Sequence, residues 1–122
     1  MPIRILLVDD DEAFRSVTAI ALESEGCEVN VANDAYAALA ALNEDHPDVI
    51  VCDLNMPGLD GRDLCHWVRS NPSMADVRLV VLSSLIEPDG SGIPSNLQAD
   101  CFLSKQTNFS QLLSLIVLLV NR

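Results

Sequence analysis

The chain has 122 residues, of which 49% are hydrophobic, and a formal net charge of −11 at pH 7. This length suits one domain with a sizeable core, and the hydrophobic content excludes a disordered chain. The acidic balance argues against nucleic acid or an anionic membrane as a direct partner, and it favours divalent cations or basic proteins. A plain solvated acidic surface is the alternative that composition leaves open.

We expect neither export nor membrane insertion. Charge appears at Arg4 and again from Asp9 onward, which does not fit a signal peptide, and the apolar run 115–120 is too short to cross a bilayer. No CxxC pair occurs and the cysteines lie mostly in apolar segments, so we interpret them as reduced thiols of a cytoplasmic protein. They are Cys27, Cys52, Cys65 and Cys101.

The first predicted strand, residues 3–8, leads directly into four acids. Asp11 and Glu12 fit the first turn of a helix, where backbone N–H groups and the helix dipole favour negative charge. Asp9 and Asp10 fall at the end of the strand, where this explanation holds less well.

The helix that follows is predicted to turn Phe14, Val17 and Ala21 inward and to end at Gly26. Residues 28–32 then alternate between apolar and polar side chains, which predicts a second strand.

A second helix, capped by Asn33 or Asp34, precedes four apolar and mostly β-branched residues at 49–52. This run predicts a strand that is buried on both faces. It ends on Asp53, and Pro57-Gly58 then turn the chain. An acid at the rim of an open α/β sheet either binds a ligand or merely opens the turn, and this segment alone does not decide between the two.

On the third predicted helix, His66 is expected to be solvated rather than a metal ligand. Residues 77–82 form the fourth predicted strand and place Ser83 at its end. Prolines and glycines then crowd the next segment. The helix expected there is therefore predicted to be short or irregular, with at most one or two turns near residues 95–99.

Residues 101–104 complete the predicted strands, and residues 110–120 form the last helix. Strands that alternate with helices predict an α/β fold with right-handed crossovers, a doubly wound (βα)5 sandwich. We expect the flavodoxin-like order 2-1-3-4-5 for the five parallel strands, which places the switch point between the first and third strands. The connections are too short for a second domain, so residues 1–122 are predicted to be a single domain.

Five polar side chains follow the carboxyl ends of the strands: Asp9, Asp10, Asp53, Ser83 and Lys105. Three carboxylates close together repel one another unless a cation intervenes, and Mg²⁺ prefers such oxygen ligands. A carboxylate could then act as nucleophile and form an acyl phosphate, with Ser83 and Lys105 binding the phosphoryl oxygens. Lys105 is the only lysine among seven basic residues, and its compact ammonium suits a small phosphate pocket, although alone it would be an ordinary surface charge.

Four motifs stand in order along the chain: ILLVDDD at 5–11, VIVCDLNMPGLDG at 49–61, VVLSS at 80–84 and CFLSK at 101–105. Together they resemble the response-regulator receiver domain, the phosphoacceptor module of two-component signalling. Each motif is weak by itself, but four in this order and spacing are specific, and the resemblance covers the whole chain.

The resemblance implies a role for each matching residue. Asp53 would accept a phosphoryl group from the phosphohistidine of a histidine kinase or phosphotransfer protein. Asp10, Asp53 and the backbone carbonyl of Asn55 would bind Mg²⁺, with Asp9 acting through water.

The resemblance also implies a switch. Ser83 takes the position of the family's switch hydroxyl and Phe102 that of its switch aromatic. Their movement would change the shape of the face made by the helix before the fifth strand, the fifth strand and the last helix. Such a face is a two-state element that a local change of charge biases.

The chain departs from the family at the residue after Lys105. Gln106 stands where the family usually has proline, so the isomer of this peptide bond is left open.

The last helix is apolar almost all round, which is unusual for a helix with one solvated face. One face carries Leu112, Leu115, Ile116 and Leu119, and a second carries Leu113, Val117 and Val120. We predict that the second face packs against a second copy of the chain, a neighbouring domain or another partner. The alternative is a loosely exposed apolar strip.

The leading functional hypothesis is therefore a phosphorylatable switch, not an enzyme beyond slow self-catalysed phosphoryl transfer and hydrolysis. A receiver-like scaffold that binds partners without phosphorylation is the alternative, and the broken segment before the fifth strand favours it. A dehalogenase-like phosphohydrolase is the least favoured, because it needs a second acid where this chain has Asn55.

Overall fold

The computed structural model describes residues 2–54, 61–94 and 96–121. Its five strands form one parallel sheet in the order β2-β1-β3-β4-β5, which confirms the predicted flavodoxin-like topology. The strands are β1 (Arg4–Val8), β2 (Glu28–Ala32), β3 (Val49–Cys52), β4 (Arg78–Ser83) and β5 (Cys101–Ser104).

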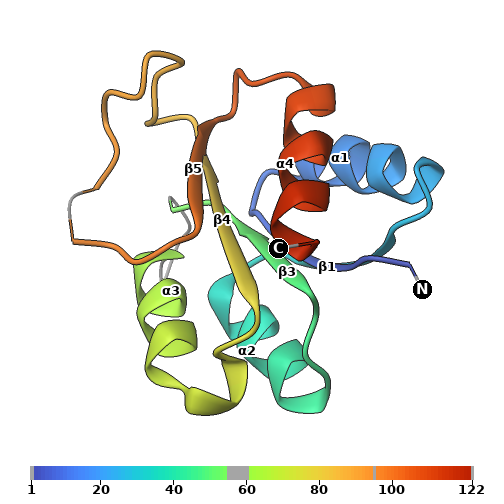
Figure 1. Cartoon of the computed structure of the whole chain (residues 1–122), viewed down its shortest axis with the longest axis vertical. Helices are drawn as coiled ribbons and strands as arrows, with labels where there is room; N and C mark the ends of the chain where they lie inside the picture. The colour runs from blue at the N-terminus through green and yellow to red at the C-terminus, as the bar shows by residue number, and fades with distance from the viewer. Residues whose placement is uncertain (1, 55–60, 95, 122) are drawn as a thin grey trace.

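Helices cover both faces of this sheet, with α1 and α4 on one side and α2 and α3 on the other (Figure 1). The helices are α1 (Glu12–Ser24), α2 (Ala35–Glu44), α3 (Gly61–Ser70) and α4 (Phe109–Val120), with a 3₁₀ turn at Pro72–Met74. Of the helices that the structure describes, none has the length and apolar character needed to cross a membrane.

Strand β3 joins the two halves of the core, as its apolar run predicts. Val49 and Val51 point into the cluster under α1 and α4, whereas Ile50 and Cys52 point into the cluster under α2 and α3. All four side chains are buried, and each large one contributes about 1.5–3 kcal/mol to folding. The strand therefore gives the residue that follows it a rigid support.

Asp11 caps the first helix, and Phe14 packs against the core as predicted, but Val17 does not face the core. Asp11 Oδ1 accepts a hydrogen bond from the Phe14 N–H at 3.1 Å. Val17, however, is 69% exposed, while the buried residues are Thr18, Ala19 and Leu22. This helix has apolar residues on more than one of its faces, so their spacing does not determine which face is buried. Packing of the large Leu22 side chain against the core determines it.

The segment before β5 is irregular, as predicted: its described residues, 84–94 and 96–100, contain turns and no helix. Gly92 adopts φ +89°, and a Cβ there would lie 2.3 Å from the carbonyl oxygen of Leu85, so only glycine fits. Ile86 and Leu97 are buried in the α2/α3 side of the core. These two side chains attach the described parts of the segment to the core.

Candidate functional site

The register of the central strands places two acids side by side. Val8 pairs with Cys52, so Asp9 and Asp53 are the next residues on neighbouring strands. The Asp53 N–H donates to the Val8 carbonyl at 3.0 Å, and the Asp9 N–H donates to the Ala32 carbonyl at 3.1 Å. Both acids therefore belong to the carboxyl edge of the sheet, beside its switch point.

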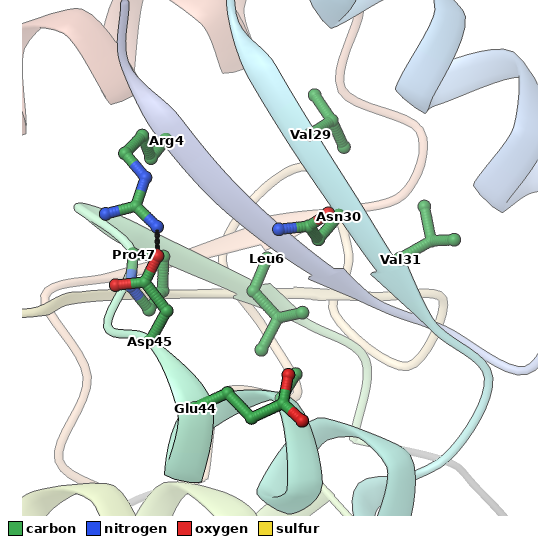
Figure 2. A pocket seen from close by; sticks show the side chains of 9 residues that line it. Arg4, Leu6, Val29, Asn30, Val31, Glu44, Asp45 and Pro47 are labelled. Atoms are coloured by element: carbon green, nitrogen blue, oxygen red, sulfur yellow. Dashed lines mark hydrogen bonds and ion pairs between the residues drawn. The ribbon is translucent and has the colours of Figure 1, made fainter.

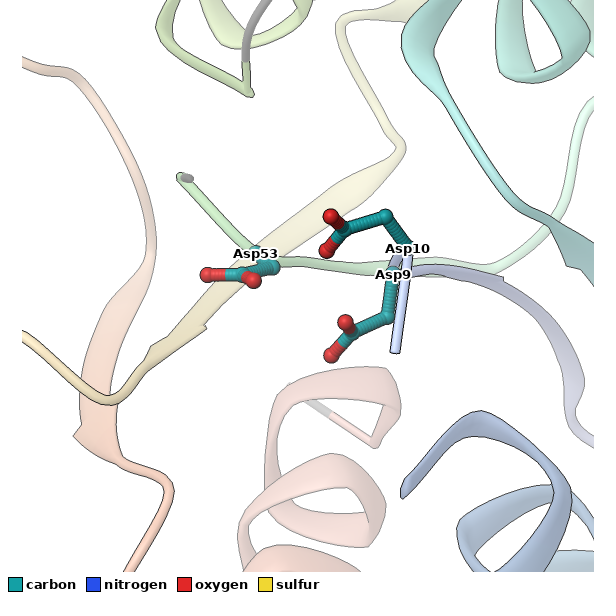
Figure 3. A group of neighbouring side chains, drawn as sticks. All are labelled: Asp9, Asp10 and Asp53. Carbon is teal, nitrogen blue, oxygen red and sulfur yellow. The ribbon is translucent and has the colours of Figure 1, made fainter. Parts of the chain in front are cut away.

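The structure brings Asp9, Asp10 and Asp53 together, with one carboxylate oxygen of each within 4.8 Å of the others. Figure 3 shows the three carboxylates converging on one space beyond the strand ends. Asp9 and Asp53 are only 1% and 4% exposed, whereas Asp10 is open to solvent. The cluster thus has two buried walls and one accessible side.

Lys105 reaches into this cluster from the end of β5. Its Nζ lies 2.8 Å from Asp9 Oδ2 and 3.3 Å from Asp53 Oδ2. Burial lowers the pKa of Lys105, but hydrogen bonds and Coulomb attraction from Asp9 and Asp53 outweigh burial, so its pKa is raised. A charged ammonium therefore offsets part of the negative charge of the cluster.

Both carboxylate oxygens of Asp9 have partners. Oδ1 accepts from the Asp11 N–H at 2.9 Å, and Oδ2 pairs with Lys105. The Arg15 guanidinium donates to the Asp9 carbonyl at 2.8 Å, which ties this residue to α1. Asp9 is consequently held in one orientation.

Ser83 is fully buried at the end of β4, directly beside β5. Its carbonyl accepts the Lys105 N–H at 3.0 Å, which links the backbone positions of the two residues. Its hydroxyl oxygen accepts the Leu85 N–H at 3.1 Å. The hydroxyl proton is still available for donation, because a hydroxyl both accepts and donates.

Of the two other predicted site residues, only one can be placed. Phe102 is half-buried and packs against the α2/α3 side of the core. Asn55 lies outside the described residues. The peptide bond between Lys105 and Gln106 is trans, since the described residues contain no cis peptide bond.

The donor set fits a hard divalent cation. It consists only of carboxylate oxygens, which Mg²⁺ prefers, and Asp10 leaves the cluster open to the solvent that supplies the other ligands. Asp9, Asp10 and Asp53 are the described residues that could hold such an ion, although both Asp9 oxygens already have partners in Lys105 and the Asp11 N–H.

One residue of the site was missed by the sequence analysis. The Phe14 ring lies under the Lys105 ammonium, with Nζ 4.5 Å from the ring centroid. We had placed Phe14 only on the inner face of its helix. Its position four residues after Asp10, on the first turn of α1, is the signal that points to the rim of the sheet.

A separate cleft of about 540 Å³ lies along β2 and α2 and includes Arg4, Asn30 and Glu44 (Figure 2). Arg4 begins β1, so this cleft is at the opposite end of the sheet from Asp9. Arg4 forms an ion pair with Asp45 at its edge. The cleft is not part of the acidic site.

The model of the response regulator receiver domain family matches residues 5–117. The chain belongs to this family. The matched span includes all of the sheet except Arg4, and every residue of the acidic cluster.

Similar proteins agree with this assignment. The response regulator MprA of Mycolicibacterium vanbaalenii is 33% identical over 122 residues, which are 100% of this chain and 52% of that protein. The chain thus spans about half the length of the curated relatives that it matches.

Two solved receiver structures share the fold. The chemotaxis response regulator CheY4 of Vibrio cholerae has a TM-score of 0.86 at 27% identity, covering 98% of this chain and 99% of that one. The receiver domain of a signal transduction histidine kinase from Syntrophus aciditrophicus has a TM-score of 0.87 at 26% identity, covering 97% and 89%. The receiver resemblance drawn from the four motifs is therefore confirmed.

Proposed function

We propose that this receiver domain is a phosphorylation-dependent switch in which Asp53 accepts a phosphoryl group. The observation that carries the proposal is the ammonium of Lys105, 3.3 Å from Asp53 Oδ2 inside a cluster of three carboxylates. A structural ion pair does not need two further acids, whereas phosphoryl transfer to a carboxylate uses both a cation-binding cluster and a lysine.

The phosphoryl donor is a phosphohistidine of a histidine kinase or of a phosphotransfer protein. An oxygen of the Asp53 carboxylate attacks phosphorus, so a P–O bond forms while the P–N bond breaks. The electron pair of that bond stays on the imidazole nitrogen, which takes up a proton. Slow attack of water on phosphorus later returns the carboxylate and inorganic phosphate, so the domain is a switch rather than a turnover enzyme.

Each neighbouring residue has a role in this proposal. Lys105 pairs with one phosphoryl oxygen, and Ser83 donates its hydroxyl proton to another. Asp10 and Asp53 hold Mg²⁺ together with the Asn55 carbonyl, and Asp9 acts through water. Bound Mg²⁺ supplies neutralising charge to the transferring oxygens.

The switch itself involves Ser83 and Phe102. A phosphoryl group that accepts the Ser83 proton competes with the present contact between the hydroxyl and the Leu85 N–H. A shift of Ser83 would therefore move the start of the loop whose Ile86 and Leu97 lie in the core cluster that Phe102 packs against. The output face comprises this loop, β5 and α4, which have two arrangements that phosphorylation biases.

Helix α4 supplies a partner surface. Its residues 109–120 carry no charge, Val117 is 39% exposed and Leu118 is 64% exposed. Leu113 and Val120 are half-buried against the core rather than open. We propose that a second copy, a neighbouring domain or another protein covers this strip in the working protein.

The proposal places a single receiver domain over residues 1–122 in the cytoplasm. Its four cysteines are unpaired, as expected in a reducing compartment. We propose that the signalling output is transmitted by contact with another protein or with a further part of the same protein.

A non-phosphorylated receiver-like scaffold is the second candidate, favoured by the loop that replaces the helix before β5. Incubation with phosphoramidate and Mg²⁺, followed by intact mass, separates the two. We expect one phosphoryl adduct on the wild type and none on Asp53→Asn. A wild type without adduct would support the scaffold, and rapid multiple turnover of phosphate esters would support an enzyme.

A further inference from the structure

The contact between Phe14 and Lys105 joins two elements that are far apart in the chain. Phe14 lies on the first turn of α1, where Asp11 caps its N–H at 3.1 Å. Its ring packs in the core cluster that also includes Leu22 and Ile116, so its position is fixed by packing. The Lys105 Nζ lies 4.5 Å from the ring centroid.

This distance is within the range of a cation–π attraction, which is about 6 Å. The attraction is stronger where water is excluded, and the Lys105 side chain is only 14% exposed. The lysine side chain is long and flexible, so a fixed neighbour restricts where its ammonium can lie.

Among the described residues, the Lys105 ammonium contacts Asp9, Asp53 and the Phe14 ring. In the proposed reaction Asp53 becomes an acyl phosphate, and Asp9 shares its charge with a cation. Both ionic partners therefore change during the reaction, whereas the ring does not. Phe14 is the neighbour that holds the ammonium in place throughout.

We propose that Phe14 is a positioning residue that keeps the Lys105 ammonium directed at the phosphoryl oxygens of phosphorylated Asp53. The proposal rests on the proposed function for its reaction. It differs from simple apolar packing because it depends on the electrons of the ring, which fluorine withdraws with little change of volume.

The first test uses the only lysine of the chain. Lysine labelled at ¹³Cε and ¹⁵Nζ gives one side-chain signal by NMR, that of Lys105. We expect the protons of its ε-methylene to be shifted upfield by the ring current, and Phe14→Leu to abolish this shift. A wild-type signal at the position of free lysine would overturn the proposed geometry without any phosphoryl chemistry.

The second test introduces mono-, di- and trifluorophenylalanine at position 14 by site-specific incorporation. We expect the rate of Asp53 phosphorylation by phosphoramidate to fall stepwise, by about threefold to tenfold over the series, as the cation–π attraction weakens. The same series at Phe109, which packs in the same cluster, is the matched control and should leave the rate unchanged.

The outcomes are separable from those of the proposed function. A rate that is independent of fluorination at position 14, or one that falls equally at position 109, would overturn the role of Phe14 while Asp53 still carries phosphate. A wild type that forms no adduct would instead contradict the proposed function. The contact between Phe14 and Lys105 would then be tested by the NMR signal of Lys105 alone.

Discussion

Lys105 and Asp9 form the shorter of the two ion pairs in the acidic cluster, with Nζ 2.8 Å from Asp9 Oδ2 and 3.3 Å from Asp53 Oδ2. Asp9 is buried, and Lys105 supplies the opposite charge beside it. The ammonium thus lies between a carboxylate that is not itself phosphorylated and one that we propose to be phosphorylated. Because it already lies beside Asp53, the Lys105 side chain needs no large movement to reach a phosphoryl oxygen there.

Removing the Lys105 charge should destabilise the fold. Lys105→Met leaves two buried carboxylates without their cation, and we expect the free energy of unfolding at pH 7 to fall by about 1–3 kcal/mol without Mg²⁺. Added Mg²⁺ should recover part of this loss, because it replaces the missing positive charge. Urea denaturation of the wild type and Lys105→Met, with and without Mg²⁺, measures this difference in the free energy of unfolding. Equal free energies of unfolding for the two proteins would contradict a stabilising ion pair.

The same pair predicts a dependence of stability on alkaline pH. Burial lowers the pKa of Lys105, but Asp9 and Asp53 outweigh burial and raise it above the ordinary 10.5. A raised pKa means that the folded state holds the proton more tightly, so this stabilisation is complete below pH 10.5 and is lost as pH rises through the higher folded value. The stability difference between wild type and Lys105→Met should shrink over that range; a difference that grew with pH would refute the sign.

The loop before β5 predicts a contrast between two glycines. Gly92 and Gly90 both have positive φ, of +89° and +91°, but a Cβ at Gly92 meets the Leu85 carbonyl oxygen at 2.3 Å. At Gly90 the nearest atom is Ile93 Cδ1 at 3.9 Å. Gly90→Ala should therefore cost about 1–2 kcal/mol, from backbone strain alone, and Gly92→Ala more. Equal losses on thermal unfolding would show that the loop is not built as described.

The exposed strip on α4 predicts association through Leu118. Leu118→Glu should leave the free energy of unfolding within about 0.5 kcal/mol of the wild type, because this side chain is 64% exposed. Sedimentation of the wild type at high concentration, with and without phosphoramidate, should reveal a dimer that the variant lacks. If the wild type stays monomeric in both states, a second copy is excluded as the partner of this strip.

The strands and the site were predictable for one physical reason. A parallel sheet needs buried apolar runs, and the residue that ends each run must lie at the same edge, so Asp9, Asp53 and Lys105 had to meet. The rotation of α1 about its axis was not predictable, because the helix has apolar residues on more than one face. Burial of Leu22 determines which face meets the core. Val17 was therefore assigned to the wrong face.

Two further features depend on contacts that the sequence analysis did not predict. The loop that replaces the helix before β5 is held by Ile86 and Leu97 in the core, which proline and glycine content alone does not reveal. The contact of Phe14 with Lys105 joins α1 to the residue that follows β5. The role of Asn55 stays a prediction, because it lies outside the described residues.

The most direct test of the central claim locates the phosphoryl group. The protein is incubated with phosphoramidate and Mg²⁺ and treated with borohydride, which reduces an acyl phosphate to homoserine, and its peptides are then sequenced by mass spectrometry. We predict homoserine at position 53, with unchanged aspartate at positions 9 and 10, and much less conversion in Lys105→Met. Unchanged aspartate at position 53, or homoserine at position 9 or 10 instead, would contradict the account.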